Sequence, residues 1–259
     1  SKTGHPVVAL AVGELKNMKN LTGKRYWLIG ASEGLGAALA RKMSNQGVEL
    51  ILSGRNAQAL QDVVDALPNP ALALPCDVSS QDSMDAAVVK LGDVDGIVYL
   101  AGLYWPMNTK DWLKTEATAM ADVNFTGAMR ALGSIVPQFV DRNDGHIVIT
   151  GSLGGFRGMP GAIGYSAAKA GLMTLAECMH IDLKNTGICV QMVNPGYIKT
   201  RLTDKNSGTM PFIMQPEEAA EIMFKHMCSE KFSISFPTLF ATFFRCLPLF
   251  PNWLYYRIF

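Results

Sequence analysis

The feature that most constrains the fold is an alternation of short, continuously apolar runs with longer helical patterns between residues 24 and 235. The apolar runs are Tyr26–Gly30, Val48–Ser53, Ala71–Pro75, Gly96–Leu100, His146–Thr150, Ile188–Val193 and Phe232–Ser235. The segments between them predict helices over Leu35–Asn45, Ala57–Leu67, Asp82–Leu91, Glu116–Val140, Ala167–Lys184 and Glu217–Cys228. Because the runs do not alternate between apolar and polar residues, both faces of each strand are expected to be buried under helices. We therefore expect a three-layer α/β fold with a doubly wound parallel sheet of about seven strands.

Composition bounds the class of protein and its partners. The chain has 259 residues, a length that favours one α/β domain. With 23 basic and 22 acidic residues the net charge is +1, so we expect no binding of nucleic acid through bulk positive charge. The five cysteines include no C-x-x-C pair, which argues against a disulfide framework or a structural zinc site. We therefore expect reduced thiols, a cytoplasmic location and no metal centre.

A glycine-rich loop follows the first predicted strand directly. It reads Gly30-Ala31-Ser32-Glu33-Gly34-Leu35-Gly36 and opens the next helix. Glycines let the backbone turn sharply and approach a pyrophosphate, whose charge the free N–H groups at the helix start then stabilise. The strand–turn–helix context favours phosphate binding over a plain tight turn.

The end of the second predicted strand bears on which nicotinamide cofactor is preferred. An acidic residue there would bind the adenine ribose 2′-hydroxyl and repel a 2′-phosphate. The chain has Ser53-Gly54-Arg55-Asn56 instead, without an acid. The alternative is that Arg55 is a solvated turn residue. Given the glycine loop upstream, a guanidinium that suits a phosphate dianion favours NADPH over NADH.

Tyr165 and Lys169 lie at positions i and i+4 near the start of a predicted helix, so they share one helix face. A neighbouring ammonium favours the phenolate and is expected to lower the pKa of Tyr165 from its usual value near 10. That tuning is what a general acid or base needs. Taken alone, the pair fits better with a packed tyrosine beside a solvated lysine.

Two further polar residues favour the interpretation of Tyr165 and Lys169 as a general acid or base. Ser152 follows the fifth predicted strand, where the carboxyl ends of a doubly wound sheet line the ligand crevice, and its hydroxyl could hold a carbonyl oxygen. Asn124 falls inside the long predicted helix, where asparagine is a mediocre helix former. It predicts a local irregularity of the helix, which could coexist with a role in binding water.

These motifs occur in the order found in the short-chain dehydrogenase/reductase family, which the chain resembles from about Leu21 to Ser235. The family's glycine motif is matched by Gly30, Gly34 and Gly36, and its catalytic Asn, Ser, Tyr and Lys by Asn124, Ser152, Tyr165 and Lys169. The Asn-Ala-Gly motif after the fourth strand is present as Leu100-Ala101-Gly102, and the Thr before the first glycine is Ile29. Both departures fall on positions that are largely structural in the family.

The resemblance implies a Rossmann-like enzyme that transfers a hydride between NADP(H) and a carbonyl or secondary alcohol. Tyr165 would donate the proton, Ser152 would hold the carbonyl oxygen, and Lys169 would hold the nicotinamide ribose. Asn124 would anchor a water that feeds a proton relay to Lys169. Asp77 would contact the adenine and Thr200 the nicotinamide carboxamide. The implied cofactor-binding residues are Gly30, Ser32, Glu33, Gly34, Leu35, Gly36, Arg55, Asp77, Val78, Ala101, Gly102, Tyr165, Lys169, Pro195, Gly196, Ile198 and Thr200.

The last 24 residues, 236–259, stand apart from that core. They hold nine of the 23 aromatic residues, and their only charges are Arg245 and Arg257. Pro237, Pro248 and Pro251 interrupt the run, so it is not expected to span a bilayer. Three interpretations stay open: packing on the domain or on a second subunit, docking on a membrane surface, or a lid over an apolar pocket.

The predicted organisation is an N-terminal extension over 1–22, one dinucleotide-binding catalytic domain over 23–235 and the aromatic tail over 236–259. We expect a small-molecule carbonyl or alcohol substrate and a homo-oligomer, either a dimer or a tetramer. Apolar stretches around Tyr104–Met107, Leu153–Gly161 and Tyr197–Gln215 favour a hydrophobic ketone as substrate. Two alternatives stay open, a membrane-surface reductase of a lipid-type keto substrate and a non-catalytic NADPH-binding protein of the same fold.

Overall fold

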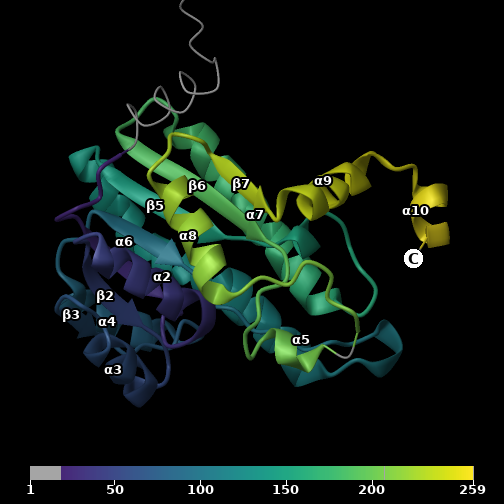
Figure 1. Ribbon diagram of the computed structural model, residues 1–259, viewed down its shortest axis with the longest axis horizontal. Helices are drawn as coiled ribbons and strands as arrows, with labels where there is room; N and C mark the ends of the chain where they lie inside the picture. Colours follow the sequence, from purple (N-terminus) through teal and green to yellow (C-terminus); the bar gives the residue numbers. More distant parts are fainter. Residues whose placement is uncertain (1–18, 207, 259) are drawn as a thin grey trace, which may run out of the picture.

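The computed structural model describes residues 19–206 and 208–258 and contains one seven-stranded parallel sheet (Figure 1). Its strands follow the order β3-β2-β1-β4-β5-β6-β7. They are β1 Arg25–Ile29, β2 Glu49–Ser53, β3 Ala71–Ala73, β4 Gly96–Tyr99, β5 Gly145–Thr150, β6 Ile188–Pro195 and β7 Ser233–Phe236. The strand order runs outward in opposite directions from the boundary between β1 and β4, which places a crevice at the carboxyl ends of the strands there. The doubly wound α/β fold predicted from the sequence is confirmed.

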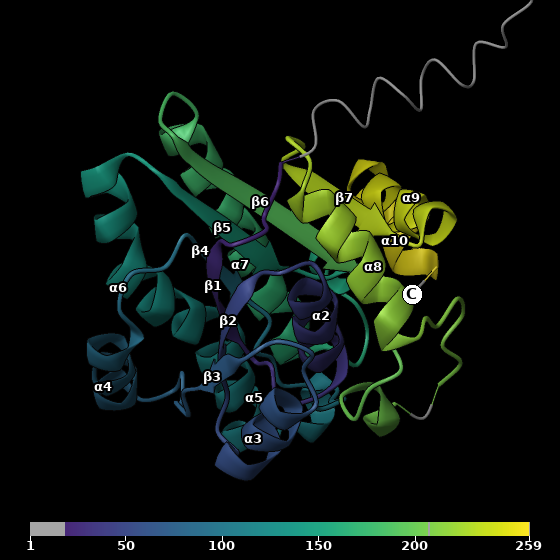
Figure 2. The same ribbon diagram turned by 60° about the vertical axis from the view of Figure 1, so that its left-hand side comes forward.

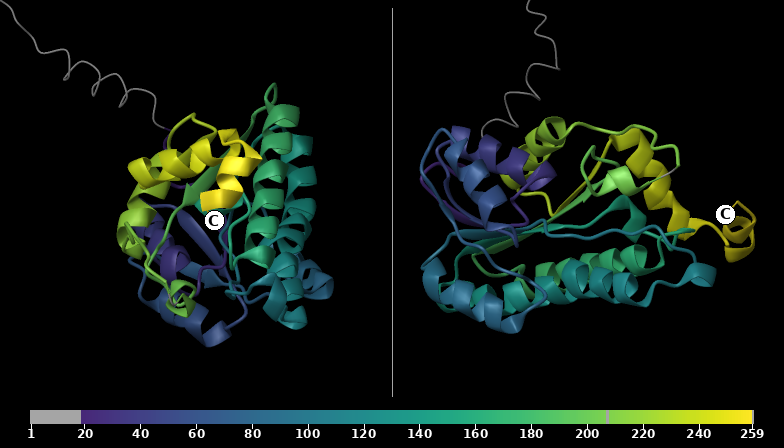
Figure 3. Two further views of the ribbon diagram at one scale, coloured as in Figure 1. Left: turned by 90° about the vertical axis from the view of Figure 1, so that its right-hand side faces the viewer. Right: turned by 90° about the horizontal axis from the view of Figure 1, so that it is seen from below.

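Helices cover both faces of the sheet (Figure 3). On one face lie α2 (Gly34–Asn45), α3 (Ala57–Asp65) and α8 (Pro216–Met227), and Figure 2 shows α2 beside α8. On the other face lie α4 (Gln81–Leu91), α5 (Lys114–Ala121), α6 (Gly127–Arg142) and α7 (Ile163–Leu183). This three-layer arrangement buries the sheet completely at its centre.

Each central strand divides its side chains between two hydrophobic cores. From β1, Trp27 and Ile29 enter the core beneath α4, α6 and α7, whereas Tyr26 and Leu28 enter the core beneath α2 and α8. Successive side chains of a strand point to opposite faces of the sheet, and here both faces are apolar. The unbroken apolar runs in the sequence are therefore explained by burial on both sides.

Two predicted helices differ from the observed ones. The segment Glu116–Val140 is not one regular helix, because a π-helical turn at Asp122–Thr126 separates α5 from α6. This turn is the irregularity expected at Asn124. The other predicted helix, Ala167–Lys184, begins too late, since α7 starts at Ile163. No side-chain cap precedes α7, so the sequence carries no signal for its start.

The C-terminal segment forms an arm that extends past the end of the sheet (Figures 1 and 3). Phe236, which the sequence assigned to the tail, is the last residue of β7. The arm consists of α9 (Thr238–Cys246), a 3-10 turn at Leu247–Leu249 and α10 (Asn252–Ile258). Pro237 precedes α9, Pro248 lies in the 3-10 turn and Pro251 precedes α10, so the prolines interrupt the helical run. Among the described residues, no helix is long and apolar enough to cross a bilayer. Most of the predicted N-terminal extension lies outside the described residues.

Candidate active site

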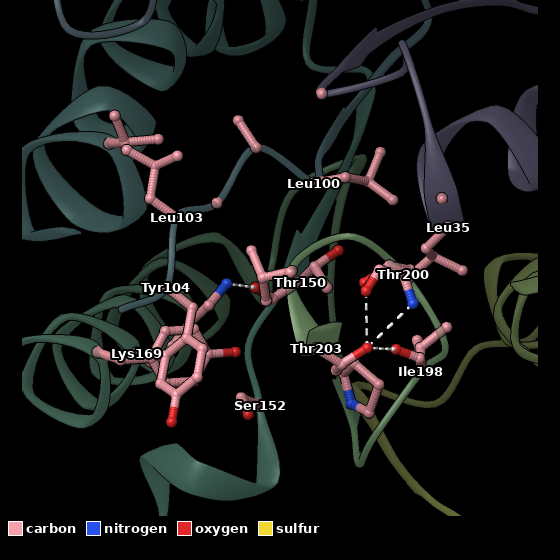
Figure 4. Close-up of a pocket in the computed structure, with 18 of the residues that line it drawn as sticks. Leu35, Leu100, Leu103, Tyr104, Thr150, Ser152, Lys169, Ile198, Thr200 and Thr203 are labelled. Carbon is pink, nitrogen blue, oxygen red and sulfur yellow. Dashed lines mark hydrogen bonds between the residues drawn. The ribbon is translucent and has the colours of Figure 1, made fainter. Parts of the chain in front are cut away.

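The carboxyl ends of β1, β2, β4, β5 and β6 border one cavity of about 670 Å³ (Figure 4). All seventeen residues predicted to bind the cofactor line it, and so does Ser152. Asn124 is the one predicted site residue that does not line it. The topology thus brings together residues from most of the length of the chain.

The glycine loop approaches its neighbours so closely that no side chain fits. A Cβ on Gly30 would lie 2.5 Å from the backbone nitrogen of Ala101, and one on Gly36 would lie 2.0 Å from the carbonyl oxygen of Gly30. Gly30 and Gly34 also have φ values of +93° and +55°, a region that favours glycine. The loop therefore presents bare backbone to the cavity at the start of α2.

The start of α2 is suited to an anion. The Glu33 side chain does not cap the helix and instead forms an ion pair with Arg201, with 2.7 Å between Oε1 and Nη2. The first N–H groups of a helix need an external partner, and the helix dipole favours negative charge there. The bare backbone of the glycine loop and the N–H groups at the start of α2 therefore fit the pyrophosphate of a dinucleotide.

At the end of β2, the Ser53 hydroxyl makes its hydrogen bonds to other residues of the protein. It accepts a hydrogen bond from Trp27 Nε1 at 2.8 Å and donates one to the carbonyl of Leu74 at 2.6 Å. Arg55 is exposed and lines the cavity, so it is the charged side chain that β2 offers to a ligand. An adenosine phosphate would meet a cation here and no acid from this strand.

Asp77 lines the same cavity as the glycine loop. Burial raises the pKa of this carboxyl, but two hydrogen bonds from Ser79, with the positive charges of Arg55 and Arg130, lower it below its usual value overall. Ser79 donates from its backbone N–H at 2.9 Å and from its hydroxyl at 2.7 Å to Oδ1 of Asp77. Asp77 is therefore a fixed carboxylate that can accept further hydrogen bonds.

Ser152, Tyr165 and Lys169 meet where β5 ends against α7. Lys169 is 4% exposed, and its Nζ donates to the carbonyl of Thr150 at 2.8 Å (Figure 4). Its Nζ also lies 5.9 Å from the centroid of the Tyr165 ring. Burial lowers the pKa of Lys169 to about 8. The ammonium is thus held on the main chain, facing the cavity.

The pKa of Tyr165 differs from the prediction. Burial raises it, and the nearby Ser152 hydroxyl opposes the rise without reversing it. The expected lowering by Lys169 is wrong for this arrangement, because desolvation of the phenolate has the larger effect. Tyr165 is therefore a protonated phenol at neutral pH, with the Ser152 hydroxyl nearby.

Asn124 is fully buried on the π-helical turn. Its Oδ1 accepts from the N–H of Leu103 at 2.6 Å, and its Nδ2 donates to the carbonyl of Leu103 at 2.9 Å. These two hydrogen bonds to the main chain of Leu103 fix the loop after β4, which carries Ala101 and Gly102. Binding of a water by Asn124 stays a prediction.

The loop after β6 is braced by a residue that the sequence analysis missed. Thr203 accepts a hydrogen bond from the Thr200 N–H at 3.0 Å and contacts the carbonyls of Ile198 and Thr200 at 2.7 and 2.8 Å (Figure 4). These bonds hold Thr200 against the glycine loop, where its Cγ2 would lie 2.8 Å from a Cβ on Gly34. A threonine placed three residues after another is a weak signal of such a turn.

The other missed residues come from α9. Phe240 and Phe244 line the cavity, and their ring centroids are 4.9 Å apart. Phe240 also packs on Tyr197 and Phe212, at centroid distances of 6.0 and 5.6 Å. Tyr104 and Tyr165 also line the cavity, and their rings meet edge to face at 5.1 Å. One end of the cavity therefore has an aromatic wall to which the arm contributes.

Comparisons with known proteins agree with this geometry. The family model for short chain dehydrogenases matches residues 24–210. An uncharacterised oxidoreductase of Myxococcus xanthus is 34% identical over 242 residues, covering 91% of this chain and 96% of the relative. An uncharacterised oxidoreductase of Staphylococcus epidermidis is 31% identical, covering 68% of this chain and 78% of the relative.

Solved structures show the same fold. A short-chain dehydrogenase from Sphingobium yanoikuyae in complex with NADPH superposes with a TM-score of 0.79 at 23% identity, covering 87% of this chain and 92% of that one. An actinorhodin polyketide ketoreductase with NADPH gives a TM-score of 0.75 at 24% identity, covering 85% and 97%. Together with the family match, these findings show that the chain is an oxidoreductase of the short-chain dehydrogenase/reductase family.

Proposed function

We propose that the protein is an NADP(H)-dependent oxidoreductase that reduces the carbonyl group of a hydrophobic ketone and can oxidise the corresponding secondary alcohol. The observation that carries the proposal is the shared cavity. Ser152, Tyr165 and Lys169 line the same space as the glycine loop and Arg55. A proton donor and a dinucleotide site in one cavity are what carbonyl reduction requires.

The residues that would hold the cofactor divide along the cavity. The glycine loop would bind the pyrophosphate, Arg55 the 2′-phosphate and Asp77 the adenine. Lys169 would bind the nicotinamide ribose, and Thr200 the carboxamide. The bound nicotinamide supplies or accepts the hydride, which no side chain of the protein can do.

The protein's own residues handle the carbonyl oxygen and its proton. Ser152 would donate a hydrogen bond to that oxygen and stabilise the negative charge that develops on it. Tyr165 would then transfer its phenolic proton to the alkoxide. Its raised pKa supports the direction of reduction, since the phenol carries its proton at neutral pH. The charge of Lys169 would stabilise the phenolate left behind.

Cofactor preference can be tested with Arg55→Asp. We expect about a tenfold or larger loss of affinity for NADPH and little change for NADH, because the substitution removes the phosphate partner and places a carboxylate beside a dianion. Cofactor binding, followed by fluorescence titration, measures both affinities. Arg41→Asp on α2, which does not line the cavity, is the matched control. Undiminished binding of NADPH by Arg55→Asp would reject the preference.

Substrate class can be tested by following NADPH oxidation with ketones graded in chain length and polarity. The aromatic wall supports the expectation that kcat/KM rises with the apolar length of the substrate. Turnover of small polar or anionic ketones alone would contradict it. NADPH binding without turnover of any carbonyl would support the non-catalytic alternative instead.

A further inference from the structure

The arm has two apolar faces, and only one is buried. The inner face packs Ala241, Phe244 and Leu247 against Leu153 in a small core of its own. Along the outside runs a second set of apolar side chains, which we call the outer apolar face. It consists of Leu239, Phe243, Leu249, Trp253 and Ile258. Tyr256 is also exposed, but it borders a hollow between the arm and the body of the protein.

The outer apolar face is strongly exposed. Leu239 is 76% exposed, Leu249 79% and Trp253 70%. Large apolar side chains gathered on one exposed segment mark a surface that meets a partner. Elsewhere the exposed large apolar residues lie singly, as Val89 and Ile181 do, or in adjacent pairs such as Trp112 with Leu113 and Phe212 with Ile213. None of these forms a segment as long as the arm.

The arm is held firmly enough to present this face. The Arg157 guanidinium donates to the carbonyls of Leu247 and Phe250 and to Oδ1 of Asn252, which bond it to the turn before α10. It also stacks on the Tyr255 ring, 3.8 Å from the centroid. The Tyr255 hydroxyl donates in turn to the carbonyl of Gly158. The outward side chains are therefore displayed by an ordered element.

The charge of the segment indicates what kind of surface it meets. No Asp or Glu follows Glu230 in the chain, whereas Lys231, Arg245 and Arg257 do. Arg245 and Arg257 are both exposed on the arm. Tryptophan, tyrosine and leucine with arginine and without carboxylates is the composition of segments that lie in a membrane interface and attract anionic lipids.

A second copy of the chain is a poorer partner for this face. A two-fold interface places the same patch on both subunits. Pairing two arms would bring the arginines of both together, and the arm has no carboxylate to neutralise them. Like charges across an interface disfavour association. The projection of the arm beyond the sheet leaves it free to meet a flat surface (Figures 1 and 3).

We propose that the outer apolar face docks the protein on the surface of an anionic membrane, and that a lipid-type carbonyl compound reaches the cavity from there. The second part rests on the proposed function. It follows from α9 itself, which exposes Leu239 and Phe243 while Phe240 and Phe244 line the cavity. One helix thus joins the membrane-facing surface to the aromatic wall.

The test is flotation of the full chain with vesicles of phosphatidylcholine, with and without about one third phosphatidylglycerol. We expect binding to the anionic vesicles that weakens with added salt.

The triple variant Leu239→Ser, Leu249→Ser, Trp253→Ser should lose about tenfold or more in partitioning, and so should Arg245→Gln with Arg257→Gln. None of these five residues lines the cavity, so turnover of a water-soluble ketone should not change. A body variant, Val89→Ser, Val140→Ser, Ile181→Ser, removes three exposed apolar side chains away from the arm and should float as the unchanged protein does.

Absence of vesicle binding by the unchanged protein would overturn the proposal, and so would equal binding by the arm and body variants. Light scattering after size exclusion, without lipid, adds a second readout. If the arm variant lost an oligomer that the body variant kept, the outer apolar face would belong to a second copy. Flotation needs no turnover, so its failure is distinct from failure of the proposed reductase activity.

Discussion

Two tyrosines lie beside basic side chains at opposite ends of the sheet, and they differ in their surroundings: only Tyr165 borders the cavity. At the amino end, the Tyr26 hydroxyl lies 2.6 Å from Nδ1 of His146, whose Nε2 lies 2.8 Å from Oε1 of Gln191. Gln191 Nε2 donates to main-chain carbonyls, including that of His226 at 2.9 Å. The Gln191 oxygen must therefore accept from His146 Nε2–H, and His146 Nδ1 must accept from Tyr26. Every link of this chain ends within the protein.

At the carboxyl end, Tyr165, Ser152 and Lys169 all line the cavity. Four buried side-chain atoms have no hydrogen-bond partner among the described residues. Three lie around this end, Thr150 Oγ1, Ser166 Oγ and Asn194 Oδ1, and the fourth is Nε2 of His226, whose carbonyl accepts from Gln191. Burial raises the pKa of both Tyr26 and Tyr165. The comparison teaches that a buried tyrosine beside a base is not by itself a reactive group. Only the pair that borders open space can exchange a proton with a ligand.

Removing each hydroxyl in turn tests this difference most directly, and we expect the largest effect here. Tyr165→Phe should lower kcat/KM for a verified ketone by about 10²–10⁴-fold with little change in stability, because it removes the proton donor. Tyr26→Phe should leave kcat/KM nearly unchanged and lower the free energy of unfolding by about 1–3 kcal/mol, because His146 Nδ1 loses its buried donor. Steady-state kinetics and urea unfolding of both variants measure the two effects. Near-normal turnover by Tyr165→Phe would remove its assigned role.

The next largest effect concerns stability in acid, which we expect to depend on His146 at the amino end of the sheet. Burial lowers the pKa of His146 to about 4, from an ordinary value of 6.5. Between these values the unfolded chain takes up a proton that the folded protein does not, so stability is complete above about pH 6.5 and falls as the pH drops toward 4. The loss should reach about 3 kcal/mol.

Urea unfolding of the unchanged protein and of His146→Gln, at neutral pH and near pH 4.5, isolates this contribution from that of the carboxylates. We expect a smaller acid loss in His146→Gln than in the unchanged protein. Equal losses would show that His146 is already free to protonate in the folded state.

The smallest expected effect is a shift in a pH profile. Burial lowers the pKa of Lys169 to about 8, so kcat/KM should fall as the pH rises above 8 and the ammonium loses its charge. Lys169→Arg keeps its charge to far higher pH. Its residual activity should therefore not decline in that range. The same decline in both proteins would assign the titration to another group.

Much of this site could be predicted because it rests on local patterns. Continuous apolar runs predict buried strands, and a glycine loop between a strand and a helix predicts an anion site. The topology then carries Ser152 and Lys169 to one place. What escaped prediction depends on tertiary packing. Phe240 and Phe244 belong to a segment beyond the matched family core, and no local signal says which face of α9 turns toward the cavity.

The direction in which the pKa of Tyr165 is shifted could not be predicted, for the same reason. Spacing places Lys169 near the phenol, but only the folded structure shows that desolvation exceeds its charge and that the amine bonds Thr150. Asn124 is a similar case. Its position predicted a helix irregularity, whereas the partner of its amide, the main chain of Leu103, follows from the course of a distant loop.

The contribution of Phe240 and Phe244 to the cavity has a practical consequence for handling the protein. An aromatic C-terminal segment beyond the matched family core invites truncation to improve expression. Cutting the chain after β7 would remove a wall of the cavity together with the partners of Arg157. We expect a shortened chain to keep the glycine loop and Tyr165 but to lose part of the aromatic wall, so its substrate selectivity would not represent that of the full chain.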